Sequence, residues 1–161
     1  MSNTITIIDT DLFAQTAKAA QESPRLRKNH NFHSDNNAAC HRLLNALQPG
    51  TYVQPHCHLD PNKEETIVVV AGSFGMVIFD EQGKVTQHFV MSATGAQRGV
   101  NIPSGVFHCM IALEKDSVFF EAKAGPYVAV QQAEKAAWAP AEGEPGMAAY
   151  LASIEALFAK N

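Results

Sequence analysis

The chain has little of what marks a disulfide-bonded, secreted or membrane-spanning protein. Its three cysteines, Cys40, Cys57 and Cys109, are odd in number and widely spaced, and they form no CxxC pair. A disulfide framework is therefore not expected, and free thiols fit a reducing compartment. No segment approaches the roughly 18 consecutive apolar residues of a membrane span. The sequence opens without the basic and apolar regions of a signal peptide. We expect a cytoplasmic protein that does not contact membranes.

The chain is also short of positive charge. It has 12 Lys and Arg residues against 16 Asp and Glu residues, and its formal net charge is -4 with the seven histidines neutral. Nucleic-acid phosphates call for a basic face, so a nucleic-acid partner is not expected. The 161 residues are enough for one domain. A domain of this size buries about 70% of its unfolded surface and needs no disulfide to fold.

The sequence pattern predicts a β-rich centre between two helices. Residues 9–22 offer good N-caps and an apolar stripe, which favour a helix. Residues 25–39 are polar and are predicted to be a loop. Residues 147–160 follow a linker rich in proline and glycine and predict an amphipathic helix. The expected organisation is an N-terminal helix and loop (1–39), a barrel of short strands (40–131), and a linker with a C-terminal helix (132–161).

Two histidines in "TYVQPHCH" are candidate metal ligands. If residues 52–58 form a strand, side-chain alternation places His56 and His58 on one face and Cys57 on the other. Two imidazoles can then converge on one ion, whereas the thiol cannot join them. This spacing predicts the start of a metal site.

Further ligands must come from other strands. The segment "EETIVVVAG" offers Glu64 and Glu65 on opposite faces. Both faces are otherwise apolar, so alternation alone leaves the choice between the two acids open. His108 in "IPSGVFHCMI" is costly to bury unless it is paired or ligating. It is the remaining candidate, and Cys109 beside it is expected to point away.

These segments resemble the two conserved motifs of the cupin superfamily. "PGTYVQPHCH" with "EETIVVVAG" resembles a glycine, five residues, His-x-His, a gap, a glutamate, six residues and a glycine. "IPSGVFH" resembles Pro-x-Gly-x-x-His. The resemblance implies that Glu65 is preferred over Glu64, and that the metal ligands are His56, His58, Glu65 and His108. The gap between His58 and Glu65 is longer than in most cupins, which predicts a longer turn.

A more specific resemblance covers roughly residues 25–155. "NHNFH", "HRLLNALQPG", "HCHLDPNKEET", "FFEAKAGPY" and "WAPAEG" are similar to the WbuC family of cupin-fold metalloproteins. The resemblance implies a mainly β, single-domain cupin: a small jelly-roll β-barrel with an N-terminal and a C-terminal α-helix. It implies no established reaction, although the family's name comes from surface-polysaccharide gene clusters. Cupins often dimerise, so the resemblance also makes a homodimer plausible.

The implied ligand set indicates the kind of metal. Three imidazoles and one carboxylate make a mixed nitrogen and oxygen shell, which suits Fe, Zn, Mn, Ni or Cu and does not choose among them. A five- or six-coordinate ion would keep positions open for water or substrate. We expect one divalent transition metal ion next to a small-molecule ligand in the barrel.

Other polar residues are candidates to line the same cavity. Tyr52 and Gln54 share the predicted face of the two histidines. Arg42 and Asn45 lie on opposite faces of their predicted strand, so at most one of them points inward. Arg42 in that position would suit an anionic substrate. His33 lies in the polar loop, which is predicted to cover the mouth of the barrel.

The expected function is a metal-dependent enzyme that acts on a small sugar-like or carboxylate molecule, with a link to surface polysaccharide biosynthesis. Two alternatives stay open: a non-catalytic module that binds or senses a small molecule, and a metal with a purely structural role. Acid–base chemistry would need a side chain near the metal that does not ligate it. His33, His41 and Glu64 are candidates for that role, and no catalytic base is assigned.

Overall fold

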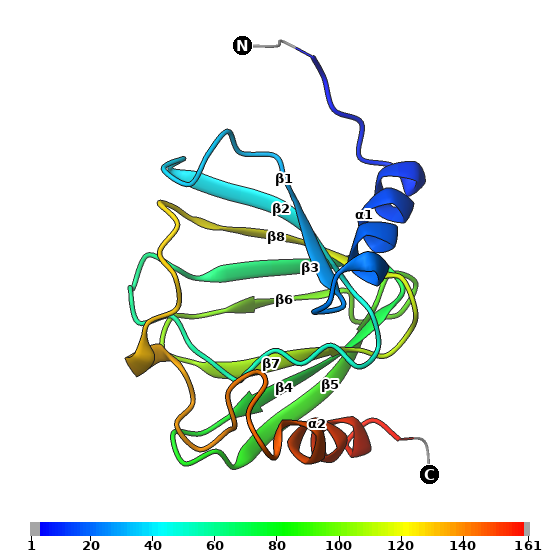
Figure 1. The fold of residues 1–161 in the computed structure, drawn as a ribbon. Helices are drawn as coiled ribbons and strands as arrows, with labels where there is room; N and C mark the ends of the chain where they lie inside the picture. Colours follow the sequence, from blue (N-terminus) through cyan, green and yellow to red (C-terminus); the bar gives the residue numbers. More distant parts are fainter. Residues whose placement is uncertain (1–3, 160–161) are drawn as a thin grey trace.

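The computed structural model describes residues 4–159 and shows two packed antiparallel β-sheets with a helix near each end of the chain (Figure 1). The five-stranded sheet has the order β1-β2-β8-β3-β6, and the three-stranded sheet has the order β5-β4-β7. This is the predicted jelly roll. The strands are β1 (Arg27–Asn31), β2 (Cys40–Leu47), β3 (Glu65–Ala71), β4 (Ser73–Phe79), β5 (Val85–Ser92), β6 (Gly99–Ile102), β7 (Phe107–Ala112) and β8 (Ser117–Ala124).

The N-terminal helix α1 (Thr10–Glu22) forms where the sequence predicts it. Asp9 is its N-cap, and the Asp9 carboxylate accepts a hydrogen bond from the backbone N–H of Leu12 at 3.0 Å. Ala17 and Ala20 are buried against the outer face of the larger sheet, where they pack with residues such as Leu44. In Figure 1 the helix lies beside β1 and β2. The cap and the small-residue stripe together confirm the predicted helix.

The C-terminal helix α2 (Met147–Ala156) covers the other sheet. Its Tyr150, Leu151 and Ile154 pack on the outer face of the smaller sheet, against residues such as Val77. The predicted helix ran to residue 160, but the helix ends at Ala156 and Lys160 lies outside the described residues. Both outer faces of the sandwich are thus covered by a helix, and the interior between the sheets is left for a core and a cavity. Across residues 4–159, no helix is both long enough and apolar enough to cross a membrane.

The polar segment predicted as a loop contains β1. This strand pairs antiparallel with β2, with Arg27 opposite Leu47 and Asn31 opposite Leu43. It is the edge strand of the larger sheet, and most of its side chains are exposed or half-buried. A polar edge strand is common because it discourages pairing with other chains. Its weak apolar pattern explains why the sequence did not indicate a strand.

The segment of residues 52–58, by contrast, is not a regular strand. Its only ladder contacts are isolated bridges from His56 to His108 and to Lys135. Pro55 cannot donate a backbone hydrogen bond, which disfavours a strand interior. The predicted strand is therefore wrong, and strict two-residue alternation does not hold here.

The glycine that closes the first motif, Gly72, is required by the turn from β3 to β4. Its φ is +67°, and a Cβ there would lie 2.9 Å from the backbone Cα of Ser117 and would contact the Ser117 hydroxyl. We expect Gly72→Ala to lower the free energy of unfolding by about 2–4 kcal/mol, from backbone strain and steric overlap together. Denaturant unfolding measures this loss.

Gly143 provides the matched control for this variant. Its φ is +83°, but a Cβ there meets nothing within 4 Å. Gly143→Ala therefore carries only the backbone strain, about 1 kcal/mol. Equal losses for the two variants would contradict the steric part of the explanation.

Candidate functional site

Three histidines and one glutamate from separate parts of the chain meet between the sheets. His56 and His58 precede β3, Glu65 is the first residue of β3, and His108 lies in β7. The ring centroid of His56 lies 5.3 Å from that of His58 and 4.7 Å from that of His108. Glu65 Oε1 is 2.8 Å from His58 Nε2, and Glu65 Oε2 is 3.3 Å from His108 Nε2. All four predicted ligands therefore lie together.

A backbone bridge holds two of these histidines in register despite the irregular chain. His56 N–H donates to the carbonyl of His108 at 3.1 Å, and His108 N–H donates to the carbonyl of His56 at 2.9 Å. This pair of hydrogen bonds ties the irregular segment to β7, which belongs to the smaller sheet. It takes the place of the regular strand that the sequence pattern predicted.

The structure places Glu65 inside and Glu64 outside. Glu65 is 4% exposed, whereas Glu64 is exposed and accepts a hydrogen bond from Asn101 at 3.3 Å. The longer turn before them is present. It contains a local turn in which the Asp60 carboxylate accepts from the backbone N–H of Asn62 at 2.9 Å.

The hydrogen bonds of two histidines determine which ring nitrogen is free. His56 Nδ1 lies 3.0 Å from the carbonyl oxygen of Gln54, and His108 Nδ1 lies 2.9 Å from that of Val106. A carbonyl oxygen can only accept, so the proton of each neutral imidazole sits on Nδ1. Nε2 then keeps its lone pair, which is the arrangement found in metal-ligating histidines. Burial, together with the charge of His108, also lowers the pKa of His56 to about 4, which favours its neutral form.

Lys123 is a member of this cluster that sequence reasoning missed. Its Nζ lies 2.8 Å from Glu65 Oε1 and 2.8 Å from Glu121 Oε1. Burial alone would raise the pKa of Glu65, but the contacts of its carboxylate with the side chains of His108 and His58 and the charge of Lys123 lower it well below the usual range. Burial works against the charged form of Lys123 as well, yet the two carboxylates raise its pKa. The pattern of β8 shows that Glu121 and Lys123 share a strand face, but only the fold brings Lys123 to Glu65.

The residue types of the cluster are ones that bind metal ions in proteins. Metal bonds of about 2.0–2.2 Å place neighbouring donor atoms roughly 3 Å apart. The separations of 2.8 and 3.3 Å between Glu65 and the two imidazoles are of that size. In the described part of the chain, however, no group of three or more His, Cys, Asp or Glu side chains is arranged so that it could hold a metal ion. The Lys123 ammonium instead supplies positive charge at one oxygen of Glu65.

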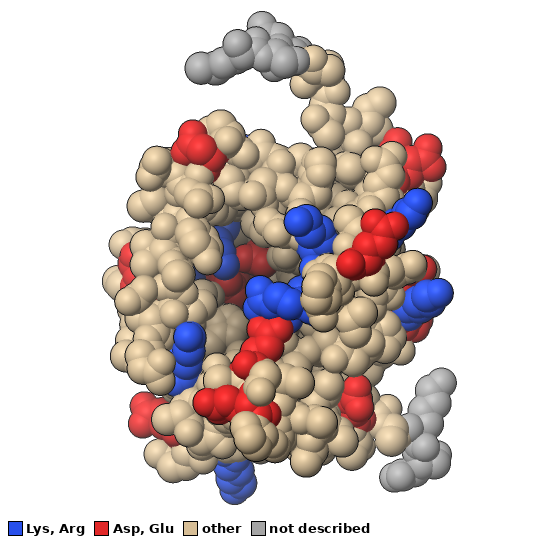
Figure 2. Space-filling model, in the orientation of Figure 1, with Lys and Arg blue, Asp and Glu red and all other residues tan. Residues whose placement is uncertain are grey.

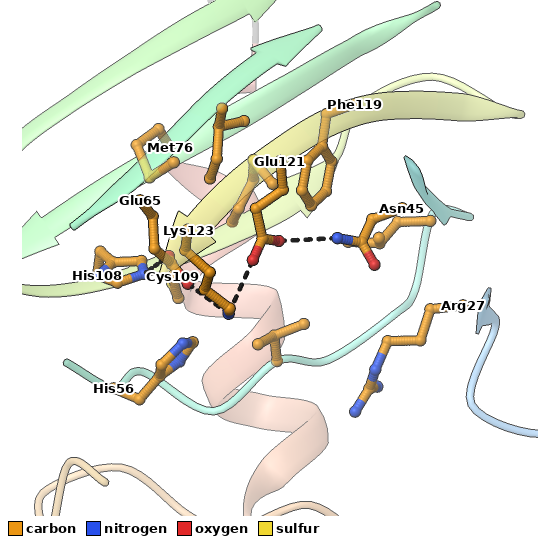
Figure 3. A pocket seen from close by; sticks show the side chains of 14 residues that line it. Arg27, Asn45, His56, Glu65, Met76, His108, Cys109, Phe119, Glu121 and Lys123 are labelled. Atoms are coloured by element: carbon orange, nitrogen blue, oxygen red, sulfur yellow. Dashed lines mark hydrogen bonds and ion pairs between the residues drawn. The ribbon is translucent and has the colours of Figure 1, made fainter. Parts of the chain in front are cut away.

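A cavity of about 200 Å³ adjoins the cluster. His56, Glu65 and His108 border one part of it, and the polar side chains elsewhere in its lining are Arg27, Asn45, Glu121 and Lys123. Figure 3 shows these side chains around a common space. Most of the other lining side chains are apolar, and Phe119 and Met76 are among them. Figure 2 is drawn in the orientation of Figure 1, and it shows a hollow in the visible face of the molecule. Both acidic and basic side chains are seen in this hollow.

Tyr52 and Gln54, which were predicted to line the cavity, do not line it. The Tyr52 hydroxyl donates to the carbonyl of Pro140 at 2.6 Å, and the Gln54 amide donates to the carbonyls of Ala136 and Ala139, each at 3.2 Å. Both side chains therefore anchor the C-terminal linker. The prediction for Tyr52 and Gln54 assumed that every second residue of a strand faces the cavity. The segment is irregular, and the residues that border the cavity are Val53 and His56, which are three positions apart.

Arg42 and His33 also lie away from the cavity. Arg42 is exposed and borders a surface depression on the outer side of the larger sheet, and Asn45 is the residue of β2 that points inward. His33 is buried, and its ring stacks on that of His41 at 4.0 Å. His33 Nδ1 lies 3.1 Å from the backbone carbonyl of Arg42, so this loop packs on β2 and contributes no side chain to the cavity lining.

The cysteine between the two histidines is turned into the protein, as the sequence analysis expected. Cys57 is 1% exposed and does not border the cavity. Cys109 packs in the cluster beneath α2, although the residue also borders the cavity.

Arg27 is a second residue that the sequence analysis missed. It comes from β1, borders the cavity, and donates to the backbone carbonyl of Tyr52 at 3.0 Å. Its other contact is an ion pair with Glu142 at 2.9 Å. Hydrogen bonds from Arg25 and Arg27 lower the pKa of Glu142 to about 2. Because the sequence predicted a loop here, nothing indicated that this arginine would reach the cavity.

The jelly-roll fold and the inward-facing histidines and glutamate define a cupin-fold protein. Solved structures with this fold include KdgF from Halomonas sp., with a TM-score of 0.51 and 17% identity over 66% of this chain and 84% of that one. The SPY1581 protein of unknown function from Streptococcus pyogenes has a TM-score of 0.52 and 9% identity over 79% of this chain and 93% of that one. At these identities, the likeness shows the fold alone.

The particular family is shown by the sequence itself. The chain belongs to the family described as a domain of unknown function, DUF6016, whose profile matches residues 8–91. The matched segment contains α1, the first cupin motif and the β4–β5 hairpin. No curated protein matches the sequence.

Proposed function

We propose that the chain is a metal-binding cupin of the WbuC type that holds one divalent transition metal ion: Fe, Zn, Mn, Ni or Cu. The ligands would be His56, His58, Glu65 and His108. The observation that carries the proposal is the hydrogen bonding of His56 and His108, whose Nδ1 atoms face backbone carbonyls and leave both Nε2 lone pairs for an ion. When bound, such an ion acts as a Lewis acid on an oxygen of the substrate.

The charges around the site favour an oxygen-rich, neutral or anionic ligand. Lys123 Nζ lies 2.8 Å from one carboxylate oxygen of Glu65 and 2.8 Å from one carboxylate oxygen of Glu121. Two carboxylates and one ammonium carry a single net negative charge, which a divalent ion converts to a single net positive charge. The role of Lys123 is to offset the repulsion between the two buried carboxylates and to hold Glu65 ionised. The chain therefore keeps its acidic ligand ready for a metal.

The proposed activity is that of an enzyme acting on a small sugar-like or carboxylate molecule, in a cytoplasmic setting linked to surface polysaccharide biosynthesis. The cavity of about 200 Å³ supports a small ligand, since pockets for drug-sized molecules have roughly 300–1,000 Å³. One observation favours a non-catalytic binding or sensing module instead. His33, His41 and Glu64, the candidates for acid–base work, do not border the cavity. Turnover of a bound ligand by the metal-loaded protein separates the two functions.

Replacing the acidic ligand tests the metal site. We expect Glu65→Gln to weaken binding of Zn or Ni by about 100-fold, because one of four ligands loses its charge and four ligands share roughly 10–16 kcal/mol of binding free energy. The measurement is competition against a chromophoric chelator, with metal content by mass spectrometry.

Glu64→Gln is the matched control, because Glu64 is the neighbouring acid on the exposed side of the barrel. It should bind metal like the unchanged protein. An equal loss in both variants, or none in Glu65→Gln, would show that Glu65 is not a ligand.

A further inference from the structure

We propose that Gln54 is a positioning residue, which couples the C-terminal linker to the tautomer of His56 and so keeps the Nε2 lone pair of His56 available. His56 borders the cavity (Figure 3), whereas Gln54 does not. The inference rests on the proposed function only for what that lone pair binds, because the hydrogen bonds that carry it need no metal. It gives Gln54 a part in the site without a place in the cavity lining.

The chain around His56 is supported by the linker as well as by β7. On the linker side, the Ala136 N–H donates to the carbonyl of Pro55 at 2.9 Å. The Cys57 N–H donates to the carbonyl of Glu134 at 2.8 Å. The linker therefore runs antiparallel to the segment that carries the histidine, and it forms one side of the frame that holds His56.

Gln54 lacks the backbone support that its neighbours have. Among the backbone–backbone hydrogen bonds of residues 4–159, none involves the N–H or the C=O of Gln54. Its carbonyl oxygen lies instead 3.0 Å from His56 Nδ1. The side-chain amide holds the residue in place, because its Nε2 donates to the carbonyls of Ala136 and Ala139, each at 3.2 Å. Gln54 thus accepts the proton of a site histidine with its backbone and is fixed to the linker by its side chain.

The two linker carbonyls also determine how the Gln54 amide is oriented. The amide nitrogen has two N–H donors, and a carbonyl oxygen can only accept. Exchanging the amide oxygen and nitrogen would place an oxygen against both carbonyls. In the described chain His56 Nδ1 has no partner other than the Gln54 carbonyl. If that carbonyl moves away, the neutral imidazole can carry its proton on either nitrogen, and a proton on Nε2 removes the lone pair that would bind a ligand.

Replacing Gln54 with methionine tests this coupling, because methionine has a similar length, adds no charge and has no donor. Nitrogen NMR of the His56 ring in metal-free protein at about pH 8, where imidazoles are neutral, measures the tautomer directly. We expect the unchanged protein to carry the proton on Nδ1 and Gln54→Met to show a mixture of both tautomers. Zinc affinity, from competition with a chromophoric chelator, should fall by about tenfold in the variant.

Tyr52→Phe is the matched control. It also removes one side-chain hydrogen bond to the linker, from the Tyr52 hydroxyl to the carbonyl of Pro140 at 2.6 Å. No hydrogen bond joins the Tyr52 side chain to His56, so both the tautomer and the zinc affinity should stay as in the unchanged protein. If Gln54→Met does not fold, Gln54→Asn takes its place, because its amide is one methylene too short to keep both carbonyls.

The outcomes separate this inference from the proposed function. An unchanged His56 tautomer without the Gln54 amide contacts, or an equal change in Tyr52→Phe, would overturn the positioning role. A changed tautomer with unchanged zinc affinity would support that role and remove His56 from the proposed ligands. If the unchanged protein binds no zinc or other transition metal, the metal leaves the proposed function, and the tautomer measurement alone decides the role of Gln54.

Discussion

Protein in which His56 and His108 are both replaced by alanine is expected to retain less than about a tenth of an equivalent of transition metal after purification. Both residues present Nε2 lone pairs, and their backbones are joined by hydrogen bonds of 3.1 and 2.9 Å. If four ligands share roughly 12 kcal/mol, each contributes about 3 kcal/mol, so loss of two weakens binding by about 10,000-fold. Elemental analysis by mass spectrometry measures the metal directly.

The stacked pair His33 and His41 offers a matched double control. Both are buried histidines, their ring centroids are 4.0 Å apart, and neither borders the cavity. Replacing both with alanine removes the same number of imidazoles and should leave the metal content unchanged. Full metal content in the His56 and His108 double variant would refute the proposed site. Loss of metal only in the control pair would move the site to the loop next to β2.

Replacing Lys123 with methionine is expected to destabilise the metal-free protein by about 3–5 kcal/mol. The change removes the ammonium that lies 2.8 Å from both Glu65 and Glu121, and it leaves two buried carboxylates without a counterion. Methionine keeps a long flexible side chain, so the loss comes mainly from the charge. The free energy of unfolding in urea gives the result.

Metal should offset much of this loss, because a divalent ion supplies the missing positive charge to Glu65. We therefore expect added Zn or Ni to raise the melting temperature of Lys123→Met by more than that of the unchanged protein. Lys135→Met, at an exposed lysine, is the control and should stay within about 0.5 kcal/mol. A stability of Lys123→Met equal to that of the control would show that the carboxylates do not depend on this ammonium. The same metal titration also tests a structural role, since a purely structural ion would stabilise strongly while no small molecule binds.

Several elements of the fold were predictable because their causes are local. Asp9 and the alanine stripe of α1 make a capped amphipathic helix, and Asp80 accepts backbone hydrogen bonds in the turn between β4 and β5. The burial alternation of β3, with Glu65 and Ile67 buried and Thr66 exposed, follows the period of a strand. Such features depend on residues a few positions apart, so the sequence pattern carries them.

The failures came from segments whose conformation depends on distant partners. β1 is a strand only because β2 pairs with it, and its polar composition hides this. The segment of residues 52–58 departs from a strand because its hydrogen bonds go to His108 and to the C-terminal linker. Alternation therefore pointed to Tyr52 and Gln54, whereas the chain turns Val53 toward the cavity.

The sequence by itself determined the residue types of the site, namely His56, His58, His108 and an acid at position 64 or 65, because their spacing and motif are written along the chain. Only the tertiary structure decided that Glu65 lies inside, that Asn45 and not Arg42 lines the cavity, and that Lys123 contacts Glu65. The physical reason is that each of these choices depends on which strand face meets the other sheet. Strand order and register set that face, and both are determined by packing between residues far apart in the sequence.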